Sequence, residues 1–219
     1  MTAALDRAPG RLAPVDADHE LLDRWRAGDK EAGQELFGRH FDSVYGFFAS
    51  KCDGEIDEMV QATFLACVRA RDQFRKESSF RTYLFTIARH ELYRYLRLRR
   101  RDGERIDFAS TSVAELVTTP GTRLARSEDH RRLLDALRHL PLEQQTLLEL
   151  HYWEDLDISA LAEVFGAPAA TIRTRLHRAR RALRDRMEET RAAPAEALAT
   201  LEGLDTWARG LSRRRNPSS

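Results

Sequence analysis

Residues 156–187 read LDISALAEVFGAPAATIRTRLHRARRALRDRM and decide the fold of this part of the chain. The apolar residues recur in steps of three and four, which places them along one side of two α-helices. They are Ile158, Leu161, Ala162 and Phe165 in the first helix and Ile172, Leu176, Ala179 and Leu183 in the second. Between the two sets, Gly166 can close one helix and Pro168 can open the next. The pattern predicts a helix-turn-helix.

The second of these helices is expected to present a basic face. With its apolar stripe turned inward, the side chains that point to solvent are Arg173, Thr174, His177, Arg178 and Arg181. Arg can bridge two acceptors on a guanine edge or clamp a phosphate, and Thr and His can reach base edges or the backbone. A merely solvated helix would usually mix charges of both signs, but residues 171–184 contain no acidic residue. The charge pattern therefore favours contact with DNA.

The composition of the chain limits its domain organisation and the compartment in which it is expected. The chain has 219 residues, of which 42% are hydrophobic and 32% charged, enough for one large domain or two small ones. The net charge of +1 hides basic blocks that acidic residues offset elsewhere, and local fields decide binding. No apolar run approaches the ~20 residues that span a bilayer, so no membrane insertion is expected. The first residues lack the apolar core of a secretion signal, so we expect a cytoplasmic protein.

Neither a catalytic nor a metal site is predicted. Cys52 and Cys67 form no CxxC pair and have no neighbouring His in the sequence, so reduced thiols, at least one of them on an apolar helix face, are expected. The His residues lack ligand spacing, and no glycine-rich phosphate loop or nucleophile elbow occurs. We therefore expect no cofactor, no metal and no enzymatic activity.

The N-terminal half is predicted to be helical after a flexible lead-in at residues 1–17. Asp29 is a plausible N-cap for the helix that follows it. A further helix, IDEMVQATFLACVRARDQF, is expected to turn an apolar stripe to the core, made of Ile56, Met59, Val60, Phe64 and Val68. After a polar loop, FRTYLFTIARHELYRYLRLRRR forms a helix whose core candidates are Phe80, Tyr83, Leu84, Ile87, Leu92 and Leu96. Its far end is strongly basic.

The order of these segments resembles that of bacterial RNA polymerase sigma factors. The shared features are the DEMVQATF helix, the SSFRTYLFTIARH segment with its arginine-rich end, a linker, an LPLEQQ segment and the helix-turn-helix. The compact extracytoplasmic-function (ECF) group, which has only regions 2 and 4, is the most similar. The resemblance covers residues 20–187. It implies an all-α chain with region 2 at residues 18–101, a flexible linker at 102–127 and region 4 at 128–187.

The resemblance also implies sites in region 2. A surface that docks on the clamp helices of the polymerase β′ subunit would contain Asp57, Glu58, Gln61 and Thr63. Recognition and opening of the −10 element would use Phe74, Phe80, Arg81, Tyr83, Arg89, His90 and Arg94. Aromatic faces can replace base stacking worth ~1–3 kcal/mol per base while Arg neutralises phosphate. Each aromatic residue could serve the core instead. Tyr83 replaces the usual Trp, and His90 replaces the usual Asn, which puts the strand contact at that position in doubt.

In region 4 the resemblance implies contact with the β flap and reading of the −35 element in the major groove. The reading positions would be Arg173, Thr174, His177 and Arg178, with phosphate contacts from Arg175, Arg180 and Arg181. Family members are often held inactive by an anti-sigma protein, although no residue of this chain identifies one. The resemblance therefore implies an ECF-type sigma factor that binds core RNA polymerase and directs promoter-specific initiation.

Two alternatives remain from the sequence. A stand-alone helix-turn-helix regulator would bind duplex DNA without polymerase, but it would need neither the DEMVQATF helix nor the aromatic loop. An interaction module without promoter activity is the other, and His90 is its only support. The extension at residues 188–219 is either disordered or a short amphipathic helix that docks on its own domains or on a partner, with apolar residues Leu198, Leu201, Leu204, Trp207 and Leu211.

Overall fold

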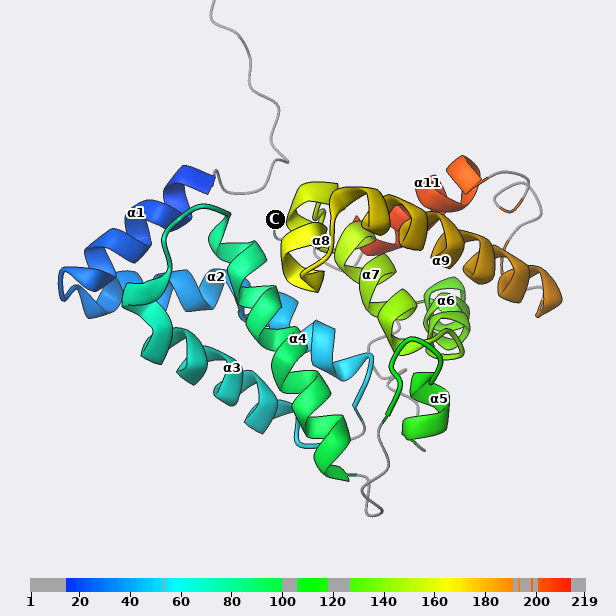
Figure 1. Ribbon diagram of the computed structural model, residues 1–219, viewed down its shortest axis with the longest axis horizontal. Helices are drawn as coiled ribbons and strands as arrows, with labels where there is room; N and C mark the ends of the chain where they lie inside the picture. Colours follow the sequence, from blue (N-terminus) through cyan, green and yellow to red (C-terminus); the bar gives the residue numbers. More distant parts are fainter. Residues whose placement is uncertain are drawn as a thin grey trace, which may run out of the picture.

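Every regular element in the described part of the chain is a helix, as predicted (Figure 1). The structure is a computed structural model that describes residues 15–52, 54–99, 106–117, 127–190, 193, 198 and 201–213. Its helices form two groups that lie side by side. We call α1 to α4 the N-terminal group, and α6 to α9 with α11 the C-terminal group. Most of the predicted lead-in and both ends of the predicted linker lie outside the described residues.

The N-terminal group is built around the aromatic and aliphatic stripes of its helices. Its elements are α1 (Val15–Arg26), α2 (Lys30–Ala49), α3 (Ile56–Ala70), a 3-10 turn (Arg71–Gln73) and α4 (Phe80–Arg99). Asp29 caps α2 as predicted, because its carboxylate accepts a hydrogen bond of 3.0 Å from the backbone N–H of Ala32. Cys52 and Cys67 are both buried and form no disulfide with each other, and Cys67 lies on the inner face of α3. Burial raises the pKa of the Cys67 thiol to about 12.

The C-terminal group contains the predicted helix-turn-helix. Its first four helices are α6 (Glu128–Arg138), α7 (Leu142–Tyr152), α8 (Ile158–Phe165) and α9 (Ala169–Glu189). Gly166 ends α8 in the left-handed conformation, with φ 59° and ψ 40°. The predicted stripe of α9 is confirmed, since its members are buried: Ile172, Leu176, Ala179 and Leu183. The same stripe leaves the basic face of α9 exposed.

Part of the predicted linker is folded. Residues 106–117 contain the short helix α5 (Val113–Leu116), which begins with a capping box between Ser112 and Glu115. The ring of Phe108 stacks on that of Tyr93 in α4 at a centroid distance of 4.2 Å. The backbone N–H of Leu142 donates to the carbonyl of Thr111 at 2.9 Å. Residues 106–117 therefore join the two groups through packing as well as through the chain.

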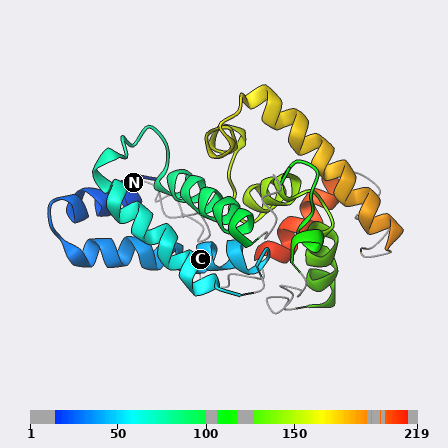
Figure 2. The same cartoon turned by 60° about the horizontal axis from the view of Figure 1, so that its bottom comes forward.

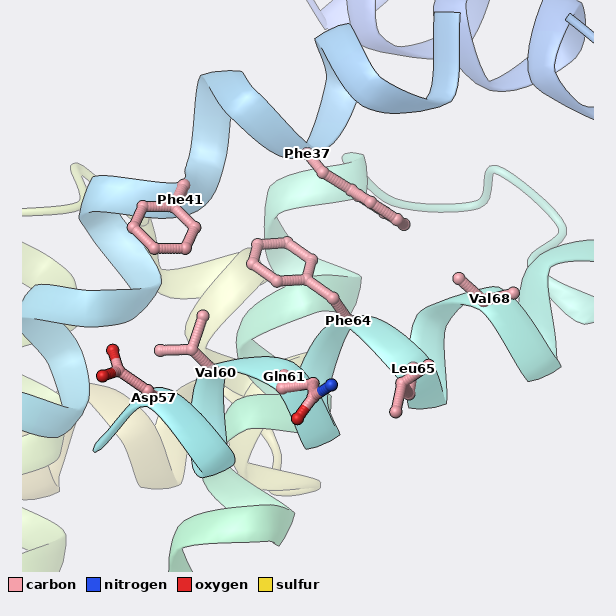
Figure 3. Close-up of a pocket in the computed structure, with 8 residues that line it drawn as sticks. All are labelled: Phe37, Phe41, Asp57, Val60, Gln61, Phe64, Leu65 and Val68. Carbon is pink, nitrogen blue, oxygen red and sulfur yellow. The ribbon is translucent and has the colours of Figure 1, made fainter. Parts of the chain in front are cut away.

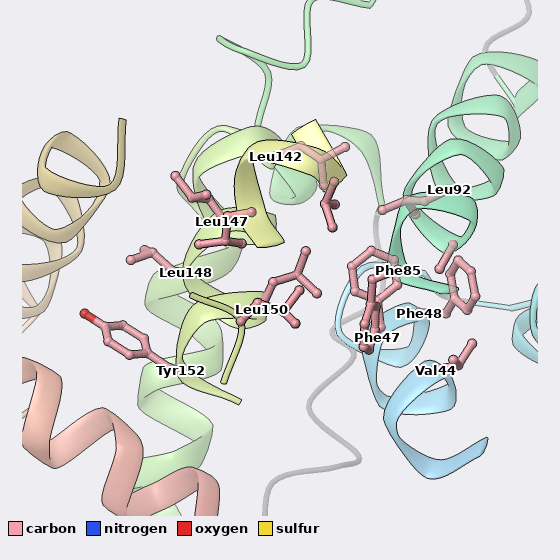
Figure 4. Close-up of a cluster of buried hydrophobic side chains, with 14 of the residues drawn as sticks. Val44, Phe47, Phe48, Phe85, Leu92, Leu142, Leu147, Leu148, Leu150 and Tyr152 are labelled. Atoms are coloured by element: carbon pink, nitrogen blue, oxygen red, sulfur yellow. The ribbon is translucent and has the colours of Figure 1, made fainter. Parts of the chain in front are cut away.

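The two groups meet where α8 packs on α4 and where Leu142 and Leu150 of α7 point toward the apolar side chains of α2 and α4 (Figure 4). Within this apolar contact lies an ion pair between Lys51, just after α2, and Glu149 of α7, with side chains 0% and 2% exposed. The Lys51 ammonium also donates to the Phe47 carbonyl at 2.9 Å. The Glu149 carboxylate accepts from Ser50 at 2.9 Å and from Gln145 at 2.8 Å. Because so many of its donors and acceptors are matched, the pair can remain in an apolar interface.

The helix α11 (Leu201–Arg213) docks on α6, α7 and α9 (Figures 1 and 2). Leu204 and Ala208 are completely buried against the C-terminal group. Asp205 forms an ion pair of 2.8 Å with Arg180 and accepts a hydrogen bond from Tyr152. The described part of the C-terminal extension is thus an amphipathic helix that covers one side of its own chain.

The turn at Gly166 generates a stability prediction. An Ala at this left-handed position should lower the free energy of unfolding by about 1–2 kcal/mol. The matched control is Gly38→Ala, at an exposed site in the middle of α2 with no atom within 4 Å of the added Cβ. That change should raise stability by about 0.5–1 kcal/mol. Denaturant unfolding measures both, and equal effects of the two substitutions would contradict the role given to the turn.

The docking of α11 generates a second prediction. Asp205→Ala removes the partner of both Arg180 and Tyr152, and should lower the free energy of unfolding by about 1–3 kcal/mol. Glu202→Ala, at an exposed position of the same helix, should change it by less than about 0.5 kcal/mol. Thermal and denaturant unfolding provide the comparison. Similar small effects of both variants would show that the Asp205 contacts do not hold α11 in place.

Candidate nucleic-acid and polymerase interfaces

The exposed face of α9 presents the predicted DNA-reading side chains together. The exposed members are Arg173, Thr174, Arg175, His177, Arg178 and Arg181. The hydroxyl of Thr174 donates to the carbonyl of Ala170 at 3.2 Å, which leaves its lone pairs toward solvent. Arg175 is the only one of them for which an ion pair is described, with Nη1 3.6 Å from a carboxylate oxygen of Glu143. The face therefore carries guanidinium donors without a neutralising partner for most of them.

Arg180 differs from these neighbours. The sequence predicts a phosphate contact at this position, but the guanidinium turns toward α11 and pairs with Asp205. It also donates to the Tyr152 hydroxyl at 3.2 Å and to Nε2 of His151 at 2.9 Å. In this conformation a carboxylate of the chain itself occupies the guanidinium, and the phosphate contact of Arg180 stays a prediction.

His151 lies at the centre of this polar cluster. Its Nδ1 donates to the carbonyl of Leu156 at 3.1 Å, so Nε2 is left as an acceptor. Both Arg180 and Arg209 donate to Nε2, the latter at 3.0 Å. Burial, together with these two positive charges, lowers the pKa of His151. The ring is therefore neutral at pH 7 and serves to hold arginines of α9 and α11.

The predicted aromatic residues of the −10 surface divide between core and surface. Phe80 is only 1% exposed and belongs to the core. Phe74 is 7% exposed and stacks on the partly buried ring of Tyr83, with centroids 4.6 Å apart. Tyr83 is thus the one of the three with a substantial exposed surface, and we leave Phe80 out of the proposed interface.

Side chains of α1 hold the loop that precedes α4 through hydrogen bonds and an ion pair. Arg26 donates to the carbonyls of Arg71 and Phe74, and Nε2 of His19 donates to the carbonyl of Ser78 at 3.2 Å. Lys76 adds an ion pair of 2.5 Å with a carboxylate of α1. Because the loop backbone is held at several points, the stacked pair of Phe74 and Tyr83 has a defined place at its edge.

The other residues predicted for the −10 surface all belong to α4, and they divide into two sets. His90 and Arg94 are exposed. Partial desolvation and the charge of Arg89 lower the pKa of His90, so this ring is neutral at pH 7. Arg81 instead forms an ion pair with Glu154, and Arg89 lies over the ring of Phe165 at 4.7 Å. Both of these arginines therefore face the C-terminal group.

The predicted polymerase face on α3 exposes three of its four members. Asp57, Glu58 and Gln61 are exposed, whereas Thr63 is buried and donates to the carbonyl of Met59 at 2.8 Å. Thr63 therefore presents no surface to a partner in this conformation. The helix phase explains the difference, since Thr63 falls on the side of α3 that also carries Met59 and Cys67.

An apolar groove lies beside these polar residues, and the sequence reading missed it (Figure 3). Its apolar lining consists of Phe37, Phe41, Val60, Phe64, Leu65 and Val68. Phe41 and Leu65 are 46% exposed and Val68 is 43% exposed. The prediction that Val68 faces the core is wrong, because Cys67 takes that position. The sequence did contain a signal for the groove. The apolar stripe of α3 is wider than packing against the core requires.

The described residues contain no group of three or more His, Cys, Asp or Glu side chains placed to hold a metal ion. None of the described helices is long and apolar enough to cross a lipid bilayer.

Both halves of the chain match known protein families. The sigma-70 region 2 family matches residues 36–102, and the sigma-70 region 4 family matches residues 130–183. An ECF RNA polymerase sigma-E factor of Haemophilus influenzae is 30% identical over 188 residues, which cover 81% of this chain and 98% of that protein. The protein of the same description in Escherichia coli K12 is 26% identical over 180 residues, covering 78% and 94%.

Solved structures give the same fold. The structure of CnrH in complex with the cytosolic domain of CnrY has a TM-score of 0.60 and 24% identity, covering 80% of this chain and 99% of that one. The sigma factor RpoE in complex with the anti-sigma factor NepR from Bartonella quintana has a TM-score of 0.56 and 23% identity, covering 71% and 96%.

Proposed function

The chain belongs to the ECF family of RNA polymerase sigma factors, and from this membership we propose how its surfaces divide the recognition of a promoter. A sigma factor of this family binds core RNA polymerase and directs initiation at specific promoters. The observation that carries the assignment to surfaces is the exposed basic face of α9, which occurs together with the stacked Phe74 and Tyr83 at the edge of α4 and an exposed apolar groove beside α3.

The exposed face of α9 reads the −35 element. A helix-turn-helix places its second helix in the major groove, where side chains near its N-terminus reach base edges. Arg173, Thr174, His177 and Arg178 lie in the first half of α9 and are assigned to bases. Arg175 and Arg181 are assigned to phosphates.

The edge of α4 acts on the −10 element. The stacked pair of Phe74 and Tyr83 offers an aromatic platform for an unpaired base. Arg81, Arg89 and Arg94 supply the charge that a single strand requires, and the neutral ring of His90 supplies a hydrogen-bonding group at the same edge. Tyr83 and His90, which depart from the usual family residues, thus fall where they would alter sequence preference.

The α3 surface binds the β′ clamp helices. The exposed Asp57 and Gln61 line the apolar groove, and the exposed Glu58 follows Asp57 in α3, so that polar residues adjoin an apolar centre. The C-terminal group is assigned to the β flap, as the family membership implies. A stand-alone DNA-binding regulator, the alternative function, would have no use for the groove.

The protein itself carries out no catalysis in this proposal. The polymerase performs the chemistry, and the sigma factor supplies promoter selection and strand opening in the cytoplasm. Run-off transcription with core polymerase on a library of randomised promoters tests this. Protein-dependent transcripts with paired upstream motifs are expected. Binding to duplex DNA without any gain in initiation would instead support the stand-alone regulator.

Arg173→Ala tests the assignment of α9. Loss of a bidentate contact to a base should reduce discrimination at one −35 position by about 1–3 kcal/mol, while binding to other sequences falls less. Arg131→Ala, on the exposed side of α6, is the control and should leave discrimination unchanged. Selection from a randomised −35 library gives the readout. An equal loss on all sequences would make Arg173 a phosphate contact.

Leu65→Asp tests the assignment of the groove. A carboxylate placed in an apolar interface must be desolvated, so affinity for core polymerase should fall at least about tenfold, which corresponds to ~1.4 kcal/mol. The matched control is Leu98→Asp, at an apolar residue of α4 that is 72% exposed and lies outside the groove. Binding to core polymerase without DNA is measured by competition. Equal affinities of the two variants would remove the groove from the interface.

A further inference from the structure

The loop between the 3-10 turn and α4, residues 74–79, does not determine its own conformation. In the described part of the chain, no backbone-to-backbone hydrogen bond involves residues 75–78. Lys76 lies in the left-handed region with φ 59°, which is unfavourable for a residue that carries a Cβ. Such a conformation persists only when contacts with the surrounding structure impose it. The shape of this loop therefore depends on side chains that reach it from elsewhere.

Helix α1 supplies the first of these contacts through Arg26. Its Nε donates to the carbonyl of Arg71 at 3.1 Å, and its Nη2 donates to the carbonyls of Arg71 and Phe74. The donors of a guanidinium are fixed in one plane, so a single side chain can set two carbonyl groups relative to each other. Because Arg26 is partly buried, water competes less with these hydrogen bonds than it would at a fully exposed residue. Arg26 thus joins the 3-10 turn to the first residue of the loop.

Two further residues of α1 contact the middle and the end of the loop. Asp23 forms an ion pair of 2.5 Å with Lys76, the residue with the unfavourable backbone conformation. Nε2 of His19 donates to the carbonyl of Ser78 at 3.2 Å. His19, Asp23 and Arg26 follow one another at steps of four and three residues and therefore share one face of α1. This face contacts the loop at its beginning, middle and end, and the loop passes beside α1 in Figure 1.

The loop carries one half of the proposed aromatic platform. Phe74 belongs to the loop and Tyr83 to α4, and their rings stack at a centroid distance of 4.6 Å. An unpaired base binds most tightly when both rings already lie in place, because ordering a loop during binding reduces the affinity. The contacts of α1 provide this order before DNA binds. The region 2 match covers residues 36–102 and does not include α1, so α1 acts here from outside the matched segment.

We propose that α1 is a positioning element of −10 recognition and that Arg26 is its principal positioning residue. Arg26 itself touches no DNA in this proposal. It acts through the carbonyls of Arg71 and Phe74, which set the position of the Phe74 ring against Tyr83. This inference rests on the proposed function, because it takes the stacked rings to be the site of an unpaired base.

The test compares Arg26→Ala with Arg24→Ala in the full chain bound to core polymerase. Arg24 belongs to the same helix, but its guanidinium pairs at the surface with Asp29, 2.6 Å away. In Arg26→Ala, discrimination at the −10 position that the rings contact should fall at least about fivefold, because misplaced rings lose base stacking. Selection at the −35 element should stay unchanged in both variants. Run-off transcription from libraries randomised at one element at a time measures these preferences.

A purely structural effect would give a different result. A less stable fold lowers the amount of active protein and reduces initiation equally on all library members, without changing the preferred bases. An unchanged −10 preference in Arg26→Ala, or equal changes of preference at the two elements, would overturn the proposal.

Asp23→Asn is a second variant, at an exposed residue of α1 that pairs with Lys76. It should reduce −10 discrimination about twofold, as expected for the loss of a surface ion pair. Circular dichroism verifies that the variants are folded. If Arg26→Ala does not fold, unchanged −10 discrimination in Asp23→Asn overturns the proposal instead.

Trypsin tests the attachment of the loop to α1 without polymerase or DNA. Arg75 and Lys76 are cleavage sites within the loop, and Arg26→Ala and Arg24→Ala each remove one cleavage site from α1. Because cleavage requires local opening, the loop of Arg26→Ala should be cut at least about threefold faster than that of the original chain. The loop of Arg24→Ala should be cut at the original rate. Mass spectrometry of the fragments gives the rates, and equal rates in the two variants would contradict the attachment.

The two measurements separate this proposal from the proposed function. If the original chain supports initiation and Arg26→Ala keeps the same −10 preference, only the positioning role of α1 is refuted. If the original chain fails to support initiation while trypsin cuts the loop of Arg26→Ala faster, the sigma role is refuted and the attachment of the loop to α1 is retained.

Discussion

The contact between Lys51 and Glu149 is the constraint on which the arrangement of the molecule depends. Removing two charges from water is unfavourable by several kcal/mol for each ion, and the attraction offsets this only when the remaining donors and acceptors are also matched. Here Phe47, Ser50 and Gln145 provide those matches. The surrounding leucines would tolerate a shifted contact, because apolar packing has little directional preference. The ion pair does not, so it fixes which part of α7 faces the end of α2, and with it the positions of α4 and α8.

The Lys51–Glu149 contact could not be predicted from the sequence, whereas several local features could. The stripe of α9, the Asp29 cap and the Gly166 turn depend on residues within a few positions of one another, and local spacing was sufficient to find them. Lys51 and Glu149 are 98 positions apart, and each is of a type that is almost never fully buried unless paired. Nothing in the periodicity of either helix signals a partner. The contact between the two groups therefore could not be predicted from the sequence, although the helices of both groups were predicted.

The candidate sites show the same division at the level of single side chains. The sequence identified the helices that carry the charges and aromatics, but not which of those side chains the rest of the chain covers. Arg180 and Arg181 are adjacent, yet one pairs with α11 and the other is exposed. Phe80 is enclosed by neighbours that include His40, with ring centroids 5.5 Å apart, while Tyr83 keeps an open side. The α3 groove was missed because Val68 is of a residue type that usually lies in a core, whereas here its side chain is 43% exposed.

The covalent attachment of α11 gives its docking a property that a separate partner helix would lack. Only residues 190–200 separate it from the end of α9, so its effective concentration at its own binding face is on the order of millimolar, as for other short covalent connections. Dilution of the protein leaves this contact unchanged, and a free helix of equal intrinsic affinity would rarely displace it at micromolar levels. A single proteolytic cut within the tether would convert the contact into a bimolecular one. The face formed by α6, α7 and α9 would then become available at ordinary cellular concentrations.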